Sequence, residues 1–383
     1  MYYYTNIIKQ IQTIRSGDPI TLQVLGIAGV GIGSEPIMKI LIIGDQFVKA
    51  EIVQQEMVRS LAPWGPLQFE TLTFDWPMKP FERNEEIAEY QGSEAEIIDR
   101  ISEAELVILH AAPISDAVLA AARKLKAIAV IRGGPTNINL AAASRRGIPV
   151  FNSPGRNAVA VVEFTIGLIL CELKNIARGH MHLVQKDWKY EYYLYDRCNF
   201  ELPGKVAGLV GFGNIAYRIS TILKAFGMTV IAHDPFVPPE RMAEYGVESV
   251  SLEELLERSD VVSVHARLTP ETHHLFNLER FRQMKPTALF VNTARGGLVN
   301  YDDLYRALNE KIIAAAALDV FQEEPCDPDS PLLQLDNVTV TPHIAGATRD
   351  TVHYGLSVLA DDLQHFLSGQ SVKNCLNPEV LRG

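Results

Sequence analysis

Three polar side chains in the second half of the chain are of the types that carbonyl reduction requires: Arg295, Glu324 and His343. Each follows an apolar run of strand type, so we expect all three at one edge of a parallel sheet. A histidine that titrates near neutrality can protonate a carbonyl oxygen, and a neighbouring carboxylate orients it and raises its pKa. A guanidinium binds a substrate carboxylate with two hydrogen bonds. Alone, each residue is more often structural, but behind a dinucleotide-binding loop they predict hydride transfer to or from a carbonyl carbon.

A glycine pattern upstream of these residues is typical of such a loop. The strand-type run Val206–Val210 leads into Gly211, Gly213 and Ala216, which are spaced as G-x-G-x-x-A. Gly211 permits a tight turn, Gly213 removes a Cβ from the path of the phosphates, and Ala216 allows a helix to pack on the strand. We therefore expect the backbone amides of residues 212–215 to hold a diphosphate at a helix N-terminus.

A carboxylate stands where this motif requires one. Asp234 follows a second strand-type run, Thr229–Ala232, about 20 residues after the glycine loop. A carboxylate there binds both hydroxyls of an adenosine ribose and repels a 2′-phosphate, which favours NAD over NADP. A plain turn between packed elements is the alternative, but the strand, the helix and the acid agree with one another. The expected NAD-binding residues of this unit are Gly211, Gly213, Asn214, Ile215 and Asp234.

The composition excludes several classes of partner. The chain has 383 residues, enough for two domains, and a net charge of −11. Nucleic acids and anionic membranes need a basic surface, so neither is expected, and no apolar run reaches the roughly 18 residues of a membrane span. The four cysteines lie far apart, without a C-x-x-C pair. We therefore expect no metal site, and reduced thiols in the cytoplasm.

Residues 1–37 predict a loosely ordered extension. They contain a tyrosine run and an apolar stretch with Gly29, Gly31 and Gly33. No helical pattern and no suitably spaced acid follow these glycines, so we do not expect a second cofactor loop. A signal peptide is an alternative, but no A-x-A-like cleavage site follows.

From Met38 to Asn152, strand-type runs alternate with helical stretches, which predicts a parallel sheet covered on both faces. The runs are Ile40–Ile43, Leu106–Leu109 and Ala127–Ile131, and the helical stretches are Ala50–Leu61, Glu94–Ile101 (with Ser93 as its N-cap) and Ser115–Leu125.

Two loops of this sheet lie where open parallel sheets bind ligands. Ala111–Ser115 follows one strand, and Arg132–Asn137 follows the next. The glycines expose backbone amides that could hold a carboxylate, and Arg132 adds a cation suited to a second acidic or phosphorylated group. The substrate-binding candidates are Ala112, Arg132, Gly133 and Gly134, although ordinary turn chemistry explains these residues equally well.

The second half of the chain predicts a doubly wound sheet of seven strands. Its runs are Val206–Val210, Thr229–Ala232, Val247–Val250, Val261–His265, Ala288–Val291, Ile313–Leu318 and Val338–Thr341, with Ser251 as an N-cap among the helices. Ala158–Arg178 predicts one long apolar helix before the sheet, and Thr348–Leu367 predicts a last helix. Asp187–Phe200 is rich in aromatic residues without clean periodicity, and we interpret it as an oligomer arm, a lid or a local cover.

Four motifs make the chain similar to a known family from Met38 to Pro378. These motifs are V-G-F-G-N-I-A, N-T-A-R-G-G-L-V, L-D-V-F-Q-E-E-P and T-P-H-I-A-G-A-T, and they resemble those of the D-isomer-specific 2-hydroxyacid dehydrogenases. The resemblance implies that Arg295 binds and polarises the substrate, that His343 is the acid and base, and that Glu324 is its partner.

The resemblance also implies further contacts and a domain organisation. Thr269, Ala294 and Asp319 would bind NAD, with Asp319 on the nicotinamide carboxamide side. A flavodoxin-like substrate domain, residues 38–153 and 343–383, would enclose a Rossmann domain, residues 154–342, and two copies would form a homodimer through their nucleotide domains. The implied activity is NAD-dependent interconversion of a 2-oxo acid and its D-2-hydroxy acid. A 3-phosphoglycerate dehydrogenase proper and an NAD(H)-sensing, corepressor-like binding protein stay open as alternatives.

Several positions depart from the family pattern. Arg267 stands where proline is usual and could contact a phosphate, including the 2′-phosphate of NADP. Asn139 and Asn300 replace usual aspartates, without an expected effect on the chemistry. Glu324 argues against a formate-type relative, in which glutamine is expected. Because the chain ends soon after its last predicted helix, we do not expect a regulatory domain.

Overall fold

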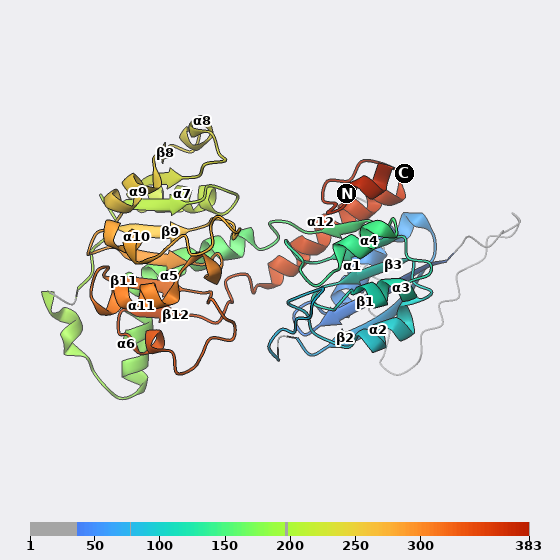
Figure 1. Cartoon of the computed structure of the whole chain (residues 1–383), viewed down its shortest axis with the longest axis horizontal. Helices are drawn as coiled ribbons and strands as arrows, with labels where there is room; N and C mark the ends of the chain where they lie inside the picture. Colours follow the sequence, from blue (N-terminus) through green and yellow to red (C-terminus); the bar gives the residue numbers. More distant parts are fainter. Residues whose placement is uncertain (1–36, 77, 196–197, 383) are drawn as a thin grey trace, which may run out of the picture. The chain divides into compact units, whose positions relative to one another are not determined.

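The protein is described by a computed structural model that covers residues 37–76, 78–195 and 198–382 (Figure 1). The predicted extension, residues 1–37, and its glycine cluster lie outside the described residues, apart from Ile37. The described chain contains two parallel sheets, one of five strands and one of seven. Helices cover both faces of each sheet, which confirms the predicted class of two doubly wound α/β sheets.

The five-stranded sheet alternates its side chains between two cores. Its strands are β1 Met38–Asp45, β2 Leu67–Phe74, β3 Leu106–Leu109, β4 Ala127–Val130 and β5 Val150–Asn152, and its helices are α1 Ala50–Leu61, α2 Glu94–Ile101, α3 Asp116–Ala121, α4 Leu140–Arg145 and α12 Arg349–Leu367. Ile40 and Ile42 face α1 and α12, whereas Leu41 and Ile43 face α2, α3 and α4. The order β2-β1-β3-β4-β5 is the flavodoxin-like order.

Both ends of the described chain contribute to this sheet. Helix α12 packs against α1, β4 and β5. Beyond it, the backbone amide of Asn152 donates to the carbonyl of Asn374 at 3.2 Å, and the amide of Leu376 donates to the carbonyl of Val150 at 2.9 Å. The C-terminal segment therefore covers the edge of β5, whose backbone groups would otherwise be open to another chain.

The seven-stranded sheet has the Rossmann order. Its strands are β6 Val206–Val210, β7 Thr229–His233, β8 Glu248–Ser249, β9 Val261–Val264, β10 Leu289–Asn292, β11 Ala315–Leu318 and β12 Val338–Val340. The order β8-β7-β6-β9-β10-β11-β12 is the 3-2-1-4-5-6 arrangement with one more strand. Helices α5 Ala158–Leu173 and α7 Ala216–Ala225 cover one face, and α9 Leu252–Arg258, α10 Leu278–Gln283 and α11 Tyr301–Asn309 cover the other.

The predicted single helix Ala158–Arg178 is wrong, because α5 ends at Leu173 and a second helix, α6, spans Ile176–Val184. Asn175 between them has a φ of 52°, a left-handed conformation that asparagine tolerates. Its side-chain oxygen accepts from Arg178, which also binds the buried carboxylate of Glu172 at 2.7 and 3.0 Å. Hydrophobic periodicity carries no information on such a polar contact, so the break was not predictable.

Side-chain caps begin several of the helices. Ser93 and Ser251 accept from the backbone amides three residues on, as predicted. Asn139 and Asn300 do the same at α4 and α11. Asparagine and aspartate cap helices about equally well, which explains why asparagine can stand at these two positions.

Two strands of the first sheet were not predicted. Strand β2 lies at the edge and is largely exposed, so it lacks a continuous apolar run, and β5 has only three residues.

Within the described ranges, no helix is both long and apolar enough to cross a membrane. The same ranges contain no group of three or more histidine, cysteine, aspartate or glutamate residues that could hold a metal ion.

Replacing Arg178 with methionine should destabilise the protein, because it leaves the buried carboxylate of Glu172 without its cation. Removal of one partner of a buried ion pair costs about 3–5 kcal/mol, which equilibrium unfolding in urea would measure. The control is Arg306→Met, which breaks the exposed pair with Glu310 and should cost less than about 1 kcal/mol. Equal losses in the two variants would contradict a structural role for the Glu172 pair.

Candidate active site

Three loops of the seven-stranded sheet carry Arg295, Glu324 and His343. The loops follow the carboxyl ends of β10, β11 and β12, which are neighbours in the sheet. Two of them lie in direct contact, because a Cβ on Gly296 would lie only 1.8 Å from the carbonyl oxygen of Phe321. Only glycine permits this approach. The sheet order therefore brings the three predicted catalytic side chains to one edge.

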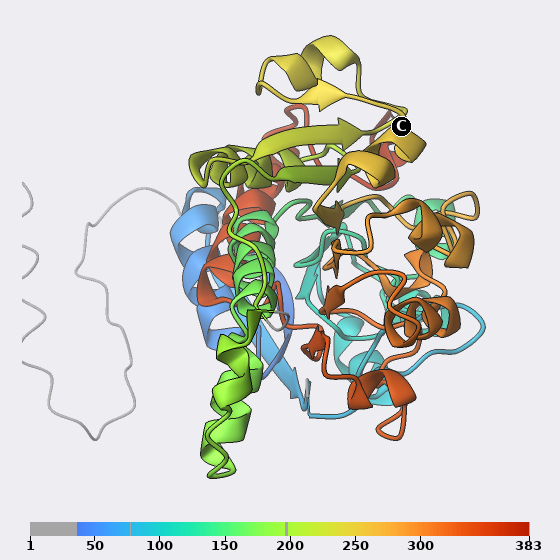
Figure 2. The same ribbon diagram turned by 90° about the vertical axis from the view of Figure 1, so that its left-hand side faces the viewer.

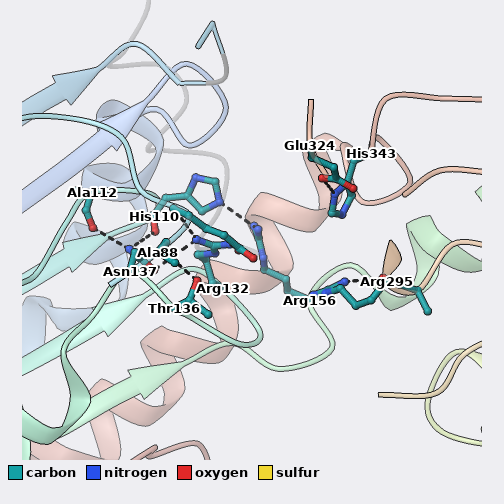
Figure 3. Close-up of polar contacts among 12 residues, drawn as sticks. Ala88, His110, Ala112, Arg132, Thr136, Asn137, Arg156, Arg295, Glu324 and His343 are labelled. Carbon is teal, nitrogen blue, oxygen red and sulfur yellow. Dashed lines mark hydrogen bonds and ion pairs between the residues drawn. The ribbon is translucent and has the colours of Figure 1, made fainter. Parts of the chain in front are cut away.

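His343 and Glu324 form an ion pair at partly exposed positions (Figure 3). Nδ1 of His343 lies 2.6 Å from Oε2 of Glu324, whose Oε1 accepts from the amide of Phe321 at 3.0 Å. The hydrogen bond to Glu324 raises the pKa of His343 above its ordinary value, although burial and the charge of Arg295 oppose the shift. Burial raises the pKa of Glu324, but the hydrogen bond and charge of His343 outweigh it, and the pKa is lowered. Because Nδ1 faces Glu324, Nε2 is the nitrogen left to exchange a proton with a substrate.

Asp319 positions the loop that carries His343. Its side chain is fully buried; Oδ1 accepts from the hydroxyl of Thr341 at 2.6 Å and from the amide of Ile344 at 2.9 Å. Oδ2 accepts from the amide of Ala345 at 2.8 Å. These bonds lie on both sides of His343, which has a φ of 55°. The contact of Asp319 with a nicotinamide carboxamide stays a prediction, and the structure gives this residue a positioning role.

Arg295 is exposed, and the side chain of Asn292 at the end of β10 stabilises the backbone of its loop. The buried side chain of Asn292 accepts from the amide of Ala294 and donates to the carbonyl of Arg295, both at 3.0 Å. Nη1 of Arg295 donates to the carbonyl of Ala294 at 2.8 Å (Figure 3). In the described part of the chain no carboxylate lies within ion-pair distance of Arg295, so its charge remains available to an anion.

The glycine loop has the backbone geometry of a diphosphate site. Gly211 has a φ of 90°, and a Cβ there would lie 2.7 Å from the amide nitrogen of Ala266, so only glycine fits. A Cβ on Gly213 would meet nothing within 4 Å, which leaves the loop open on that side. The predicted use of all four amides is wrong in one respect, because the amide of Phe212 already donates to Oδ2 of Asp234 at 2.8 Å. The amides of residues 213–215 remain for a diphosphate.

The other predicted cofactor residues lie around this loop. Asp234 is half-buried, and its second oxygen accepts from the amide of Phe236 at 2.9 Å. Thr269 and Arg267 are exposed in the loop after β9, which begins beside Gly211. A cavity of about 310 Å³ adjoins the glycine loop, and its lining residues are Phe212, Gly213, Asn214, Tyr217, Val237, Arg241 and Tyr245.

The structure treats the substrate-binding candidates on the five-stranded sheet differently. Arg132 was expected to bind a second acidic group of the substrate, but its charge is already paired with Glu89. Its guanidinium donates to the backbone carbonyl of Glu89 at 2.9 Å and pairs with the Glu89 carboxylate. Ala112 is buried and its carbonyl accepts from Asn137 at 2.8 Å. The carbonyl of Gly133 accepts from Asn152 at 2.7 Å, and a Cβ on Gly134 would meet nothing within 4 Å.

A polar network at the carboxyl edge of this sheet was not predicted from the sequence. Nδ1 of His110 lies 2.6 Å from Oδ2 of Asp45. Nε2 of His110 lies 3.1 Å from Nη2 of Arg156 (Figure 3). Burial lowers the pKa of His110 to about 4 and that of Arg156 to about 10. The only local signal was that Asp45 and His110 each follow a strand-type run, His110 directly after Leu106–Leu109.

Comparisons with known proteins agree with this geometry. The family model described as "D-isomer specific 2-hydroxyacid dehydrogenase, NAD binding domain" matches residues 166–345. The chain is 38% identical over 287 residues to the D-3-phosphoglycerate dehydrogenase of Archaeoglobus fulgidus, covering 74% of this chain and 54% of that protein. It therefore spans little more than half the length of that relative.

Two further relatives are covered more fully. The glyoxylate reductase of Korarchaeum cryptofilum is 37% identical over 287 residues, which cover 75% of this chain and 86% of the reductase. The solved structure of the TT0316 protein from Thermus thermophilus matches with a TM-score of 0.72 at 31% identity, over 88% of this chain and all of that one.

The pKa of His343 should fall when Glu324 is replaced by glutamine, because the carboxylate is the group that raises it. In the variant, the protonated imidazole should be lost at a lower pH than in the wild type. NMR titration of the assigned His343 ring measures the shift. The control is Glu310→Gln, which removes an acid bound to Arg306 and should leave the titration unchanged. A His343 pKa that stays the same in Glu324→Gln would contradict the pairing.

Proposed function

The chain belongs to the D-isomer specific 2-hydroxyacid dehydrogenase family, and on that premise we propose that it interconverts a 2-oxo acid and its D-2-hydroxy acid with NAD. The observation that carries the proposal is the His343–Glu324 pair, which lies at the same sheet edge as the glycine loop and beside a cation that no carboxylate of the described residues neutralises.

Each of the three side chains has one role in this proposal. When bound, NADH would supply the hydride for C2 of the oxo acid, and NAD⁺ would take it up in the reverse direction. Nε2 of His343 donates a proton to the carbonyl oxygen during reduction and takes it from the hydroxyl during oxidation. Glu324 holds the imidazole by Nδ1 and favours its charged form. Arg295 binds the carboxylate on C1 and polarises the carbonyl.

The residues around the glycine loop fit NAD. The amides of Gly213, Asn214 and Ile215 precede the first turn of α7, where backbone N–H groups and the helix dipole favour a diphosphate. The carboxylate of Asp234 is bonded to the loop itself, so it lies beside the turn and can accept from two ribose hydroxyls. Its negative charge disfavours a 2′-phosphate, even with Arg267 exposed on the neighbouring loop.

We also propose that two copies of the chain associate. Helix α6 extends from the end of α5 (Figure 2), and it and the following segment expose many large apolar side chains. These are Ile176, Met181, Leu183, Val184, Trp188, Tyr190, Tyr193, Leu194 and Tyr195. Many exposed apolar and aromatic side chains close together in sequence are typical of a protein interface. The net charge of −11 is in keeping with the expectation of no nucleic-acid or membrane partner. A small-molecule partner and a cytoplasmic location remain expectations.

Replacing His343 with alanine should lower the turnover of 2-oxo acids by ~10²–10⁴-fold, because the proton donor is lost. The measurement is NADH oxidation with a panel of short, hydroxylated and phosphorylated 2-oxo acids, and NADH binding should be retained. His353→Ala on α12 removes a histidine outside the site and serves as the control. If the wild type binds NADH but reduces none of the acids, the enzyme proposal fails and a dinucleotide sensor is favoured.

The double variant Leu183→Glu, Val184→Glu should dissociate the proposed dimer, because it buries two charges in the interface. Sedimentation equilibrium should give the mass of two chains for the wild type and of one chain for the variant. Val58→Glu replaces an exposed apolar residue on α1 and should leave the mass of the wild type unchanged. A monomeric wild type would contradict the proposal.

A further inference from the structure

The polar network of Asp45, His110 and Arg156 has no part in the proposed proton transfer. Asp45 ends β1, His110 follows β3 and Arg156 follows β5. The three residues therefore lie at the carboxyl edge of the five-stranded sheet, the edge at which open α/β sheets bind ligands. Asp45 and His110 are fully buried and Arg156 is half-buried, and a network of this kind in a ligand-binding position calls for a chemical explanation.

The direction of each hydrogen bond in this network is determined. The carboxylate of Asp45 is an acceptor; its Oδ1 binds the amides of Phe47 and Val48 at 2.9 and 2.7 Å, and its Oδ2 faces Nδ1 of His110. Nδ1 of His110 therefore carries a proton. Nε2 accepts from the guanidinium of Arg156, because arginine has no acceptor atom. Asp45 thus sets the orientation of His110, and His110 sets the orientation of Arg156.

This arrangement leaves part of the Arg156 guanidinium without a partner. Nη1 is buried and makes no hydrogen bond with any described residue. No carboxylate of the described residues lies within 4.0 Å of the guanidinium, in contrast to Arg132, which is paired with Glu89. The ring of Phe47 lies 6.0 Å from its central carbon, and Trp76 packs edge-on against His110 at 4.9 Å. A half-buried cation beside aromatic rings, with a buried donor that has no partner, costs free energy unless an anion binds to it.

The segment that carries Arg156 also lies next to the proposed active site. A Cβ on Gly155 would lie 2.9 Å from Nδ2 of Asn214 in the glycine loop. A Cβ on Gly346, three residues after His343, would lie 2.8 Å from Nδ2 of Asn157. The residues on both sides of Arg156 therefore touch the cofactor loop and the loop of the proton donor.

We propose that Arg156 binds an oxyanion at the end of the substrate distant from the reacting carbonyl. The proposal rests on the proposed function, in which Arg295 already takes the carboxylate on C1, and it narrows the substrate class to 2-oxo acids with a second acidic group. A guanidinium binds a carboxylate and a phosphate by the same two-pronged geometry. Substrates that lack this group leave the buried donor unpaired, and a site of this kind discriminates against them.

The first test compares acids that differ in their distal group. The wild type and Arg156→Gln are assayed with NADH and pyruvate, oxaloacetate or 3-phosphohydroxypyruvate. The kcat/KM of each diacid is divided by the kcat/KM of pyruvate. For the diacid that the wild type uses more efficiently, this ratio should be about 10–100-fold lower in the variant. The diacid with the larger loss identifies the natural group as carboxylate or phosphate. Arg123→Gln, an exposed arginine of the same sheet region, is the matched control. An unchanged ratio, including an equal loss for all acids, would overturn the proposal.

The second test does not depend on turnover. Calorimetric titration of the coenzyme-free protein with 3-phosphoglycerate, D-malate and D-lactate should show tighter binding of one of the first two, and Arg156→Gln should lose this preference. Arg156→Lys keeps the positive charge but not the planar guanidinium, and it should recover part of the binding preference. A variant that merely fails to fold could not recover it. Preferential binding that requires Arg156 supports the site even if no acid is reduced, which would refute the proposed function alone. No preference in the wild type would overturn the proposal.

Discussion

The buried carboxylate of Asp319 is the constraint on which the reactive end of this protein depends. It accepts three hydrogen bonds from residues on both sides of His343, so it specifies the path of that loop. His343 itself has a positive φ, a conformation that costs a non-glycine residue of order 1–3 kcal/mol and persists only when its surroundings dictate it. The position of the backbone therefore places the imidazole of His343 within hydrogen-bonding distance of Glu324. The ion pair is a consequence of a backbone that Asp319 holds.

The arginines near the two sheet edges differ in how their charge is balanced. Arg132 has a carboxylate partner in Glu89 and fastens the segment before α2 to the sheet. Arg156 reaches Asp45 only through a neutral histidine, and Arg295 is bonded to a carbonyl alone. Because a charge taken out of water must be compensated, these differences indicate which guanidiniums can accept a ligand anion. By residue type alone, the three arginines would have been equal candidates for an anion-binding site.

Much of the fold follows from local patterns. Apolar runs and helical periodicity located all seven strands of the Rossmann sheet, and the capping serines located two helix starts. The failures occurred where the decisive contact is polar or lies far away in sequence. Helix α5 ends where Arg178 binds both the side chain of Asn175 and the buried carboxylate of Glu172, and hydrophobic periodicity carries no information on such contacts. Strand β2 forms because β1, almost 30 residues earlier in the chain, offers it an edge.

By itself, the sequence determined the glycine turn, its acid and the three candidate catalytic residues, because the requirements of a phosphate turn and of strand ends are expressed within a few consecutive residues. Only the tertiary structure decided which groups remain available for chemistry. Glu89 is 43 residues from Arg132 and Asp45 is 65 residues from His110. The sheet brings these partners together, because strands that are distant in sequence end at one edge. Hydrogen bonding and charge pairing operate over a few ångströms in space, whatever the separation along the chain.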